Sequence, residues 1–156
     1  MSLTIRDAKL SDAPALAVLM CELGYETSNV EMHSRLQAIL RKASYRTIVA
    51  EVDNKLCGMI GTLTHASHEH NDPSGKIIAL VVSKQKRRSG VGRALVAAAE
   101  KDFASRRVTQ VTLTTRSERE GAHRFYETLG YAKMGLRFGK NLPRISARKK
   151  NKVQPR

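Results

Sequence analysis

The sequence predicts an α/β fold of the α+β kind, a single domain built on a mixed central sheet. Its 156 residues, 41% of them hydrophobic and 27% charged, are typical of one globular domain. Apolar side chains recur at helical spacing in some stretches and alternate in others, and the two kinds of stretch interleave along the chain. One strand-loop-helix-strand unit implies parallel pairing and one hairpin signal implies antiparallel pairing, so both should occur in one sheet.

The first part of the chain predicts a strand followed by two helices. Residues 3–9 are expected to form the strand. The first helix should end at Gly24, because glycine tolerates the left-handed conformation that closes many helices. Ser28 and Glu31 form a capping-box pattern, which predicts the start of the second helix.

The rest of the chain predicts strands with two further helices between them. Runs rich in β-formers at 46–52 and 56–64 flank Asp53-Asn54-Lys55, which is a hairpin signal. The later elements expected are a strand over 77–82, a helix over 91–106, a strand over 108–115, a helix over 122–129 and a final strand over 131–138. The expected order is therefore β-α-α-β-β-β-α-β-α-β.

The charge of the chain is unevenly distributed. The formal net charge is +14, with −2 on residues 1–75 and +16 on residues 76–156. Residues 1–143 are expected to form the domain, and residues 144–156, which are basic and carry no acid, a mobile tail. A basic half attracts polyanions of any kind. Aromatic residues, on which bases stack, make up only 4% of the chain, which argues against a nucleic-acid partner.

Nothing in the sequence predicts export or a membrane. It contains no run of about 18 apolar residues, and its N-terminus lacks the layout of a signal peptide. A cytoplasmic location is therefore expected. Cys21 and Cys57 lie among apolar neighbours without CxxC spacing and are expected to be buried, reduced thiols.

A strand, a basic loop and a helix start follow one another between residues 80 and 98. The basic and glycine residues of this loop are Lys84, Lys86, Arg87, Arg88, Gly90 and Gly92. The first amides of a helix lack intrahelical partners, and the helix dipole adds partial positive charge there. Glycines let a phosphate approach the backbone, and arginines add charge-assisted hydrogen bonds. The stretch therefore predicts an anion site, with phosphate as the first ligand to test.

Two familiar phosphate-binding loops do not fit this spacing. A Walker A loop needs Gly-Lys-Ser/Thr, whereas Arg93 follows Gly92. The dinucleotide fingerprint needs a third glycine where Leu95 stands. The pattern that remains is Arg87-x-x-Gly90-x-Gly92 behind a strand.

This pattern resembles the coenzyme A pyrophosphate loop of the GNAT superfamily of N-acetyltransferases. A second segment, AHRFYETLGY at residues 122–131, is similar to another motif of that superfamily. The expected order of elements is also that of the superfamily, and the resemblance covers roughly residues 3–139. It implies the GNAT fold, acetyl-coenzyme A (acetyl-CoA) as donor, and a primary amine that attacks the thioester directly.

The resemblance also implies which residues hold the donor. They are Leu80, Val81, Val82, Arg87, Arg88, Ser89, Gly90, Val91, Gly92 and Arg93. The strand residues would pair through their backbone with the pantetheine arm, and the loop and helix start would surround the pyrophosphate. An amide at or next to Val82 would meet the thioester carbonyl, where a fixed donor stabilises the developing oxyanion.

Tyr126 matches the tyrosine that in many relatives protonates the departing thiolate. The alternative is a core tyrosine on the apolar stripe of its helix. The general base is left unassigned, because Ile78 and Ala79 stand where many relatives carry a strand glutamate. Arg119 likewise stands where many relatives carry an asparagine.

Acidic residues flank the loop between the first two helices, which in relatives often borders the acceptor pocket. Glu22, Tyr25 and Glu26 are the candidate acceptor-binding residues and would suit a cationic amine; a solvated helix end is the alternative. A further loop carries three histidines, His65, His68 and His70. Because such a loop cluster lacks the fixed geometry of a zinc site, no metal is expected.

The interpretation with the most support is an acetyl-CoA-dependent N-acetyltransferase acting on a small-molecule or peptide amine. One alternative is a basic module that binds nucleic acid or a ribosome surface. Another is a GNAT-fold sensor that binds acyl-CoA without turnover, which is suggested by the absence of the strand glutamate. Many relatives dimerise, so a homodimer is an expectation that the resemblance adds.

Overall fold

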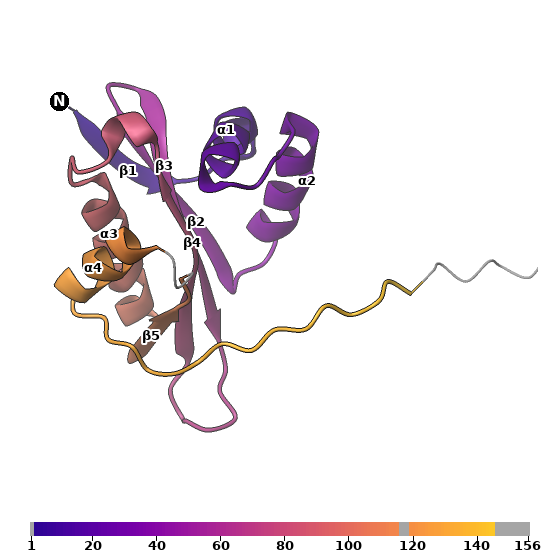
Figure 1. Cartoon of the computed structure of the whole chain (residues 1–156), viewed down its shortest axis with the longest axis vertical. Coiled ribbons are helices and arrows are strands. Elements are labelled where there is room, and N and C mark those ends of the chain that lie inside the picture. Colours follow the sequence, from indigo (N-terminus) through magenta and orange to yellow (C-terminus); the bar gives the residue numbers. More distant parts are fainter. Residues whose placement is uncertain (1, 116–118, 146–156) are drawn as a thin grey trace, which may run out of the picture.

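A five-stranded mixed sheet forms the centre of the molecule in a computed structural model that describes residues 2–115 and 119–145 (Figure 1). The strands are β1 (Leu3–Asp7), β2 (Tyr45–Val52), β3 (Lys55–His65), β4 (Ser74–Val82) and β5 (Gln110–Leu113). They lie in the order β1-β2-β3-β4-β5. The first four pair antiparallel, whereas β4 and β5 are parallel, so the predicted mixed sheet is confirmed.

Helices cover both faces of the sheet. On one face lie α1 (Ala13–Leu23) and α2 (Asn29–Leu40), and on the other lie α3 (Val91–Ser105) and α4 (Glu120–Thr128) (Figure 1). Two short 3-10 turns, η1 (Leu10–Asp12) and η2 (Lys84–Lys86), precede α1 and α3. No helix within the described ranges is both long enough and apolar enough to span a membrane.

Short-range signals in the sequence fix where these elements begin and turn. The Ser28 hydroxyl accepts a hydrogen bond from the Glu31 amide, and the Glu31 carboxylate accepts one from the Ser28 amide, each at 3.1 Å. This is the predicted capping box at the start of α2. Asp53 and Asn54 both have positive φ, as the tight turn of the β2–β3 hairpin requires.

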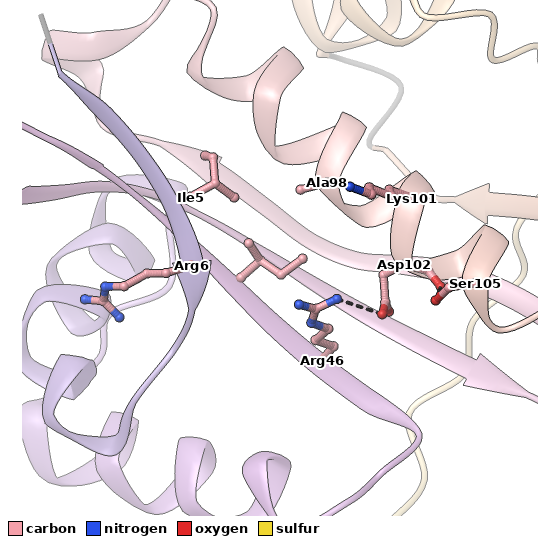
Figure 2. A pocket seen from close by; sticks show the side chains of 8 residues that line it. Ile5, Arg6, Arg46, Ala98, Lys101, Asp102 and Ser105 are labelled. Atoms are coloured by element: carbon pink, nitrogen blue, oxygen red, sulfur yellow. Dashed lines mark hydrogen bonds and ion pairs between the residues drawn. The ribbon is translucent and has the colours of Figure 1, made fainter.

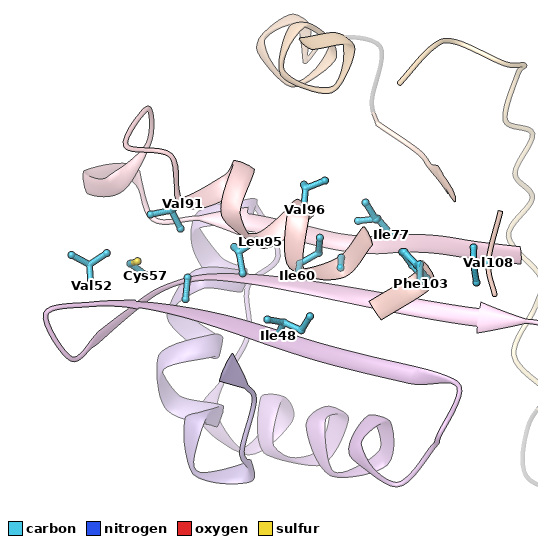
Figure 3. Packing of buried hydrophobic residues seen from close by; sticks show 12 residues of the cluster. Ile48, Val52, Cys57, Ile60, Ile77, Val91, Leu95, Val96, Phe103 and Val108 are labelled. Atoms are coloured by element: carbon cyan, nitrogen blue, oxygen red, sulfur yellow. The ribbon is translucent and has the colours of Figure 1, made fainter. Parts of the chain in front are cut away.

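Each face of the sheet packs against its helices in a separate apolar cluster. Alternate residues of β2 divide between the two, with Ile48 under α3 and Val49 under α1 and α2. Figure 3 shows the α3 cluster, to which Leu95, Val96 and Phe103 of α3 belong together with residues of the sheet. Cys57 belongs to this cluster as a buried free thiol, but the prediction that Cys21 is buried is wrong, because its thiol lies on the exposed side of α1.

One close contact anchors α3 to the start of β4. A Cβ atom placed on Gly75 would lie 2.8 Å from two ring atoms of Phe103 and 2.9 Å from Val108 Cγ1. Real Cβ atoms do not approach that closely, so only glycine lets the ring sit directly on the strand.

The predicted final strand over 131–138 is wrong. These residues have no secondary structure, and β5 pairs only with β4 among the described residues. The alternation of apolar and polar residues favours a strand, but residues 131–138 form no backbone ladder with β5 or with any other described strand. Of the predicted tail, residues 146–156 lie outside the described residues.

Candidate active site

The two halves of β4 differ in their pairing, and this difference creates an open strand edge. Ser74 to Ile77 pair with β3 on one side and with β5 on the other. From Ala79 to Val82 the strand keeps its β3 partner but has no β5 partner within the described residues. Backbone amides and carbonyls on this edge are therefore available to an extended ligand.

A β-bulge marks the point where the two strands separate. Gly61 of β3 pairs with Ala79, and Thr62 pairs with Ile77, so Ile78 is the extra residue. A bulge increases local twist and turns a strand away from its neighbour. The bulge therefore accounts for the splay between β4 and β5.

The open edge leads directly into the basic loop and the N-terminus of α3. The first amides of a helix have no intrahelical acceptor. Gly90, the N-cap of α3, supplies no side-chain acceptor for them either. Arg87, Arg88 and Arg93 are exposed, and none of them forms an ion pair with the described residues. Arg87 donates from Nε to the Val82 carbonyl at 3.4 Å. Exposed guanidinium groups beside a helix N-terminus can bind an anion, which is the kind of site that the sequence predicts here.

The two glycines of the loop suit their positions for different structural reasons. Gly90 has φ +88 with open space where a side chain would stand, so it suits a left-handed turn that a ligand can approach. A Cβ on Gly92 would lie 3.2 Å from the Phe125 ring of α4. Gly92 therefore also lets α3 and α4 pack closely.

A cavity of about 670 Å³ lies beside the open edge. Its walls come from β4, the end of β5, α4 and the loop between α1 and α2. The residues that line it are Met20, Leu23, Gly24, Tyr25, Glu26, Arg35, Ile77, Ile78, Ala79, Leu80, Leu113, Thr114, Thr115, Arg119, Ala122, Tyr126 and Arg137.

Tyr126 is the aromatic hydroxyl that α4 presents to this cavity. Its ring makes edge-on contacts with Phe125 and Tyr131, with centroids 5.2 and 5.9 Å away. Burial raises the pKa of the Tyr126 hydroxyl, which keeps it protonated at neutral pH. No hydrogen-bond partner for this hydroxyl lies in the part of the chain that the structure describes. A protonated hydroxyl that forms no hydrogen bond within the described residues can donate one to a ligand.

The predicted acceptor residues divide between two places. Tyr25 and Glu26 line the cavity, as expected. Glu22 does not line it, because its carboxylate accepts a hydrogen bond from the Lys84 amide at 3.3 Å and so supports the basic loop. Glu22 therefore joins the end of α1 to the loop before α3.

Arginines that sequence reasoning missed as site residues line the same cavity. Arg119, which stands where many relatives carry asparagine, donates from Nη2 to the Leu23 carbonyl at 3.0 Å and ties α4 to the end of α1. Arg35 of α2 donates to the Thr27 hydroxyl at 3.1 Å. Arg137 reaches the cavity from the segment after α4. No local motif signals these contacts, because each arginine comes from a different element.

The region where relatives carry a strand glutamate is apolar here. Ile78 and Ala79 both line the cavity wall. Glu26 carries the one carboxylate among the described residues that line the cavity. The general base that the sequence left unassigned thus has one anionic candidate in the described part of the cavity.

A second, smaller cavity of about 370 Å³ lies between β1, β2 and α3 (Figure 2). Arg46 crosses it and pairs with Asp102 through Nη1 at 2.7 Å and with Asp7 through Nε at 2.7 Å. Asp102 also pairs with Arg106 at 3.1 Å. Because Arg46 and Asp102 neutralise each other across it, we interpret this cavity as a structural contact between the sheet and α3.

The histidine loop lies between β3 and β4. His65 is the last residue of β3 and its ring lies 2.9 Å from the Ala66 carbonyl, whereas His68 and His70 follow in the loop. The described residues include no group of three or more His, Cys, Asp or Glu side chains placed to hold a metal ion.

Comparison with known proteins agrees with this geometry. Residues 13–131 match the family model described as the acetyltransferase (GNAT) family. A mycothiol acetyltransferase from Thermobispora bispora is 35% identical over 86 residues, which are 54% of this chain and 29% of that protein. The chain thus corresponds to less than a third of that relative.

Solved structures show the same fold. A GNAT family acetyltransferase from Staphylococcus aureus has a TM-score of 0.79 and 26% identity, covering 91% of this chain and 100% of that one. A transcriptional regulator from Bacillus halodurans has a TM-score of 0.81 at 22% identity, covering 89% and 100%. With a family match over most of its length, a splayed strand pair and a basic helix N-terminus, the chain belongs to the GNAT family of acetyltransferases.

Proposed function

We propose that this protein is an N-acetyltransferase that moves an acetyl group from acetyl-CoA to a primary amine. The observation that carries the proposal is the continuity of three features. At one end, the open edge of β4 leads to the N-terminus of α3, which has no side-chain cap and lies beside arginines that form no ion pair with the described residues. The same edge borders the cavity that Tyr126 lines. A thioester carried on a long arm with a diphosphate would fit these three features in order.

The donor would lie along β4 and end at α3. The backbone of Leu80, Val81 and Val82 would pair with the amides of the pantetheine arm, as an added strand would. The amides of Val91, Gly92 and Arg93 would meet the diphosphate. The guanidinium groups of Arg87 and Arg88 would add charge-assisted hydrogen bonds at the rim, and Ser89 completes the turn between them.

The reaction would be a direct attack. The amine nitrogen forms a bond with the thioester carbonyl carbon, and the negative charge that develops on oxygen is stabilised by a backbone amide at or next to Val82. The carbon–sulfur bond then breaks, and Tyr126 donates its proton to the departing thiolate. Glu26 would accept the proton that the amine loses, directly or through water. The products are the acetamide and free coenzyme A.

The charged side chains that line the cavity indicate which kind of acceptor it suits. Arg35, Arg119 and Arg137 line it together with a single described carboxylate, that of Glu26. We infer an acceptor that carries a polar or anionic group besides its amine, rather than the polycation that two acidic residues would have favoured.

The direct experiment is an acetyl-transfer assay with a broad panel of amines. The panel contains amino acids, short peptides, aminosugars and polyamines, and product is detected by mass spectrometry alongside thiol release. Transfer to an amine with an accompanying anionic group supports the proposal in full. Acetyl-CoA binding without transfer to any amine would favour the sensor alternative, and salt-sensitive RNA binding without acetyl-CoA binding would favour the nucleic-acid module.

A further inference from the structure

The positions at which this chain departs from the GNAT pattern meet in one cavity. Ile78 and Ala79 stand where many relatives carry a strand glutamate, and Arg119 stands where many carry an asparagine. All three line the cavity of about 670 Å³ beside the open edge of β4, although they come from different elements. A position that is acidic in relatives is thus apolar here, and a neutral polar position is cationic. Both changes alter the kind of acceptor that the cavity suits.

The β4 wall of the cavity is apolar and partly open. Ile78 is the bulge residue, and it is 42% exposed although β4 lies between two other strands. Ala79 and Leu80 continue the wall along the strand. Tyr25, which is 53% exposed, lines the cavity from the loop between α1 and α2. Exposed apolar side chains inside a cavity form a surface that an apolar part of a ligand can cover.

Arg119 is the arginine of this cavity that is best placed to hold an anion. Its Nη2 donates to the Leu23 carbonyl at 3.0 Å, which holds the side chain between α4 and the end of α1. A guanidinium has several further N–H donors, and Arg119 forms no ion pair with the described residues. The charge of Arg35 is offset by the Glu31 carboxylate, 3.8 Å away. Arg137 lies in a segment without secondary structure.

Arg119 lies on the same side of α4 as the proposed proton donor. Arg119, Ala122 and Tyr126 are spaced by three and four residues, as on one face of a helix, and all three line the cavity. An acceptor whose amine reaches a thioester beside Tyr126 therefore shares one cavity wall with a guanidinium that is held in place and carries a free charge.

We propose that the acceptor is an apolar amino acid, whose carboxylate binds Arg119 and whose side chain lies against Ile78. This inference rests on the proposed function and narrows its class of acceptor. A carboxylate and a guanidinium form parallel, charge-assisted hydrogen bonds, which give orientation as well as affinity. The amine nitrogen gains the acetyl group, so the products are the N-acetylamino acid and free coenzyme A.

The same contacts disfavour other classes of amine. A polyamine would bring a second cation toward Arg119, and like charges repel. The hydroxyl groups of an aminosugar would lose their hydration against Ile78 and Ala79, whose side chains cannot form hydrogen bonds in return. An amine without an acidic group would leave the Arg119 charge without a partner.

Matched acceptors test the role of the carboxylate. At saturating acetyl-CoA, transfer to leucine is compared with transfer to leucinamide, in which a neutral amide replaces the carboxylate. Leucine should have the lower KM, by roughly 10- to 100-fold, because losing one hydrogen bond to a charged group weakens binding by about that factor. Leucinamide has the less basic amine, so protonation of the amine cannot explain its poorer binding. Methionine and phenylalanine are compared with their amides in the same way.

The variant Arg119→Gln assigns this difference to one side chain. It should raise the KM for leucine roughly 10- to 100-fold and leave both the KM for leucinamide and the affinity for acetyl-CoA unchanged. If Arg119 only joins α4 to α1, both acceptors should be affected alike, so the ratio of the two KM values separates recognition from structure. Arg124→Gln is the matched control and should keep the wild-type ratio, because Arg124 is exposed on the same helix and does not line the cavity.

The variant Ile78→Ala tests the apolar wall. The ratio of kcat/KM for leucine to that for glycine should fall roughly fourfold for each methylene-sized contact that is lost. Val30→Ala, at an exposed position of α2 outside the cavity, should keep the wild-type ratio.

The outcomes separate this inference from the proposed function. The inference is wrong if other amines are acetylated but apolar amino acids are not, if leucinamide is accepted as well as leucine, or if Arg119→Gln weakens both acceptors equally. Each of these results leaves the protein an N-acetyltransferase. If no amine of the broad panel is acetylated, the proposed function fails, and the inference fails with it.

Discussion

The two halves of β4 belong to one strand but differ in their pairing. Ser74 to Ile77 are paired on both edges, and Gly75 lies directly beneath Phe103 in the core. Ala79 to Val82 are paired on one edge and lead to a loop whose arginines form no ion pair with the described residues. A strand with both edges satisfied contributes to stability, whereas a strand with a free edge can bind. The bulge at Ile78 separates the two roles within one strand.

The largest expected effect lies at the open half. Tyr126→Phe removes the proposed proton donor and leaves the ring in place, so kcat should fall by about 10²- to 10⁴-fold. The affinity for acetyl-CoA should not change. Steady-state kinetics and calorimetry measure the two quantities. Tyr25→Phe, in the same cavity, is the control and should keep its kcat; a Tyr126→Phe enzyme with wild-type kcat would show that Tyr126 is a packing residue.

The paired half should respond through stability. Phe103→Ala empties the site above Gly75 and should lower the free energy of unfolding by about 3–5 kcal/mol, measured by urea denaturation. Acetyl-CoA should still bind to the molecules that remain folded. Val30→Ala, at an exposed position of α2, should cost far less. A loss of binding without a loss of stability in Phe103→Ala would reverse the assignment of the two halves.

A smaller effect is expected at the basic loop. Replacing both Arg87 and Arg88 with Gln should raise the Kd for acetyl-CoA by roughly 10- to 100-fold, since one hydrogen bond to a charged group is worth about 1.5–3 kcal/mol. The variant's affinity should also depend less on salt. Arg41→Gln with Lys55→Gln removes the same charge elsewhere. An equal loss of affinity in that control would mean that only net charge matters.

The smallest effect concerns an ion pair far from the site. The Arg6 guanidinium, 2.8 Å from Asp12, holds the pKa of that carboxyl below its usual range. Because the folded-state pKa is depressed, the stabilisation is present above the unfolded-state pKa and is lost as pH falls through the folded-state pKa. Asp12→Asn should therefore cost on the order of 1.5 kcal/mol near neutral pH and progressively less in acid. A cost that is constant with pH would contradict this account.

Elements whose boundaries depend on neighbouring residues could be predicted from the sequence. The capping box at Ser28 and the glycine at position 24 mark helix ends through neighbouring residues, and the structure has these ends. The basic loop could be predicted for the same reason, since its arginines and glycines are contiguous. The fold class followed because the spacing of apolar residues reports which face of each element is buried.

Features that depend on distant residues could not be predicted. Arg35 and Arg137 come together only because α2 and the segment after α4 approach one cavity. The place of Glu22 beside a loop predicts an acceptor-binding residue, but its carboxylate instead accepts a hydrogen bond from the Lys84 amide. The alternation at residues 131–138 predicts a strand with one buried face, but it does not show whether a sheet edge pairs with it.

Amide hydrogen exchange with and without acetyl-CoA tests the central claim most directly. If the open half of β4 and the start of α3 hold the donor, acetyl-CoA should slow exchange at residues 78–82 and 88–93. Exchange at residues 74–77, which are already paired on both edges, should not change. Protection confined to some other surface, or no protection at saturating acetyl-CoA, would contradict the account.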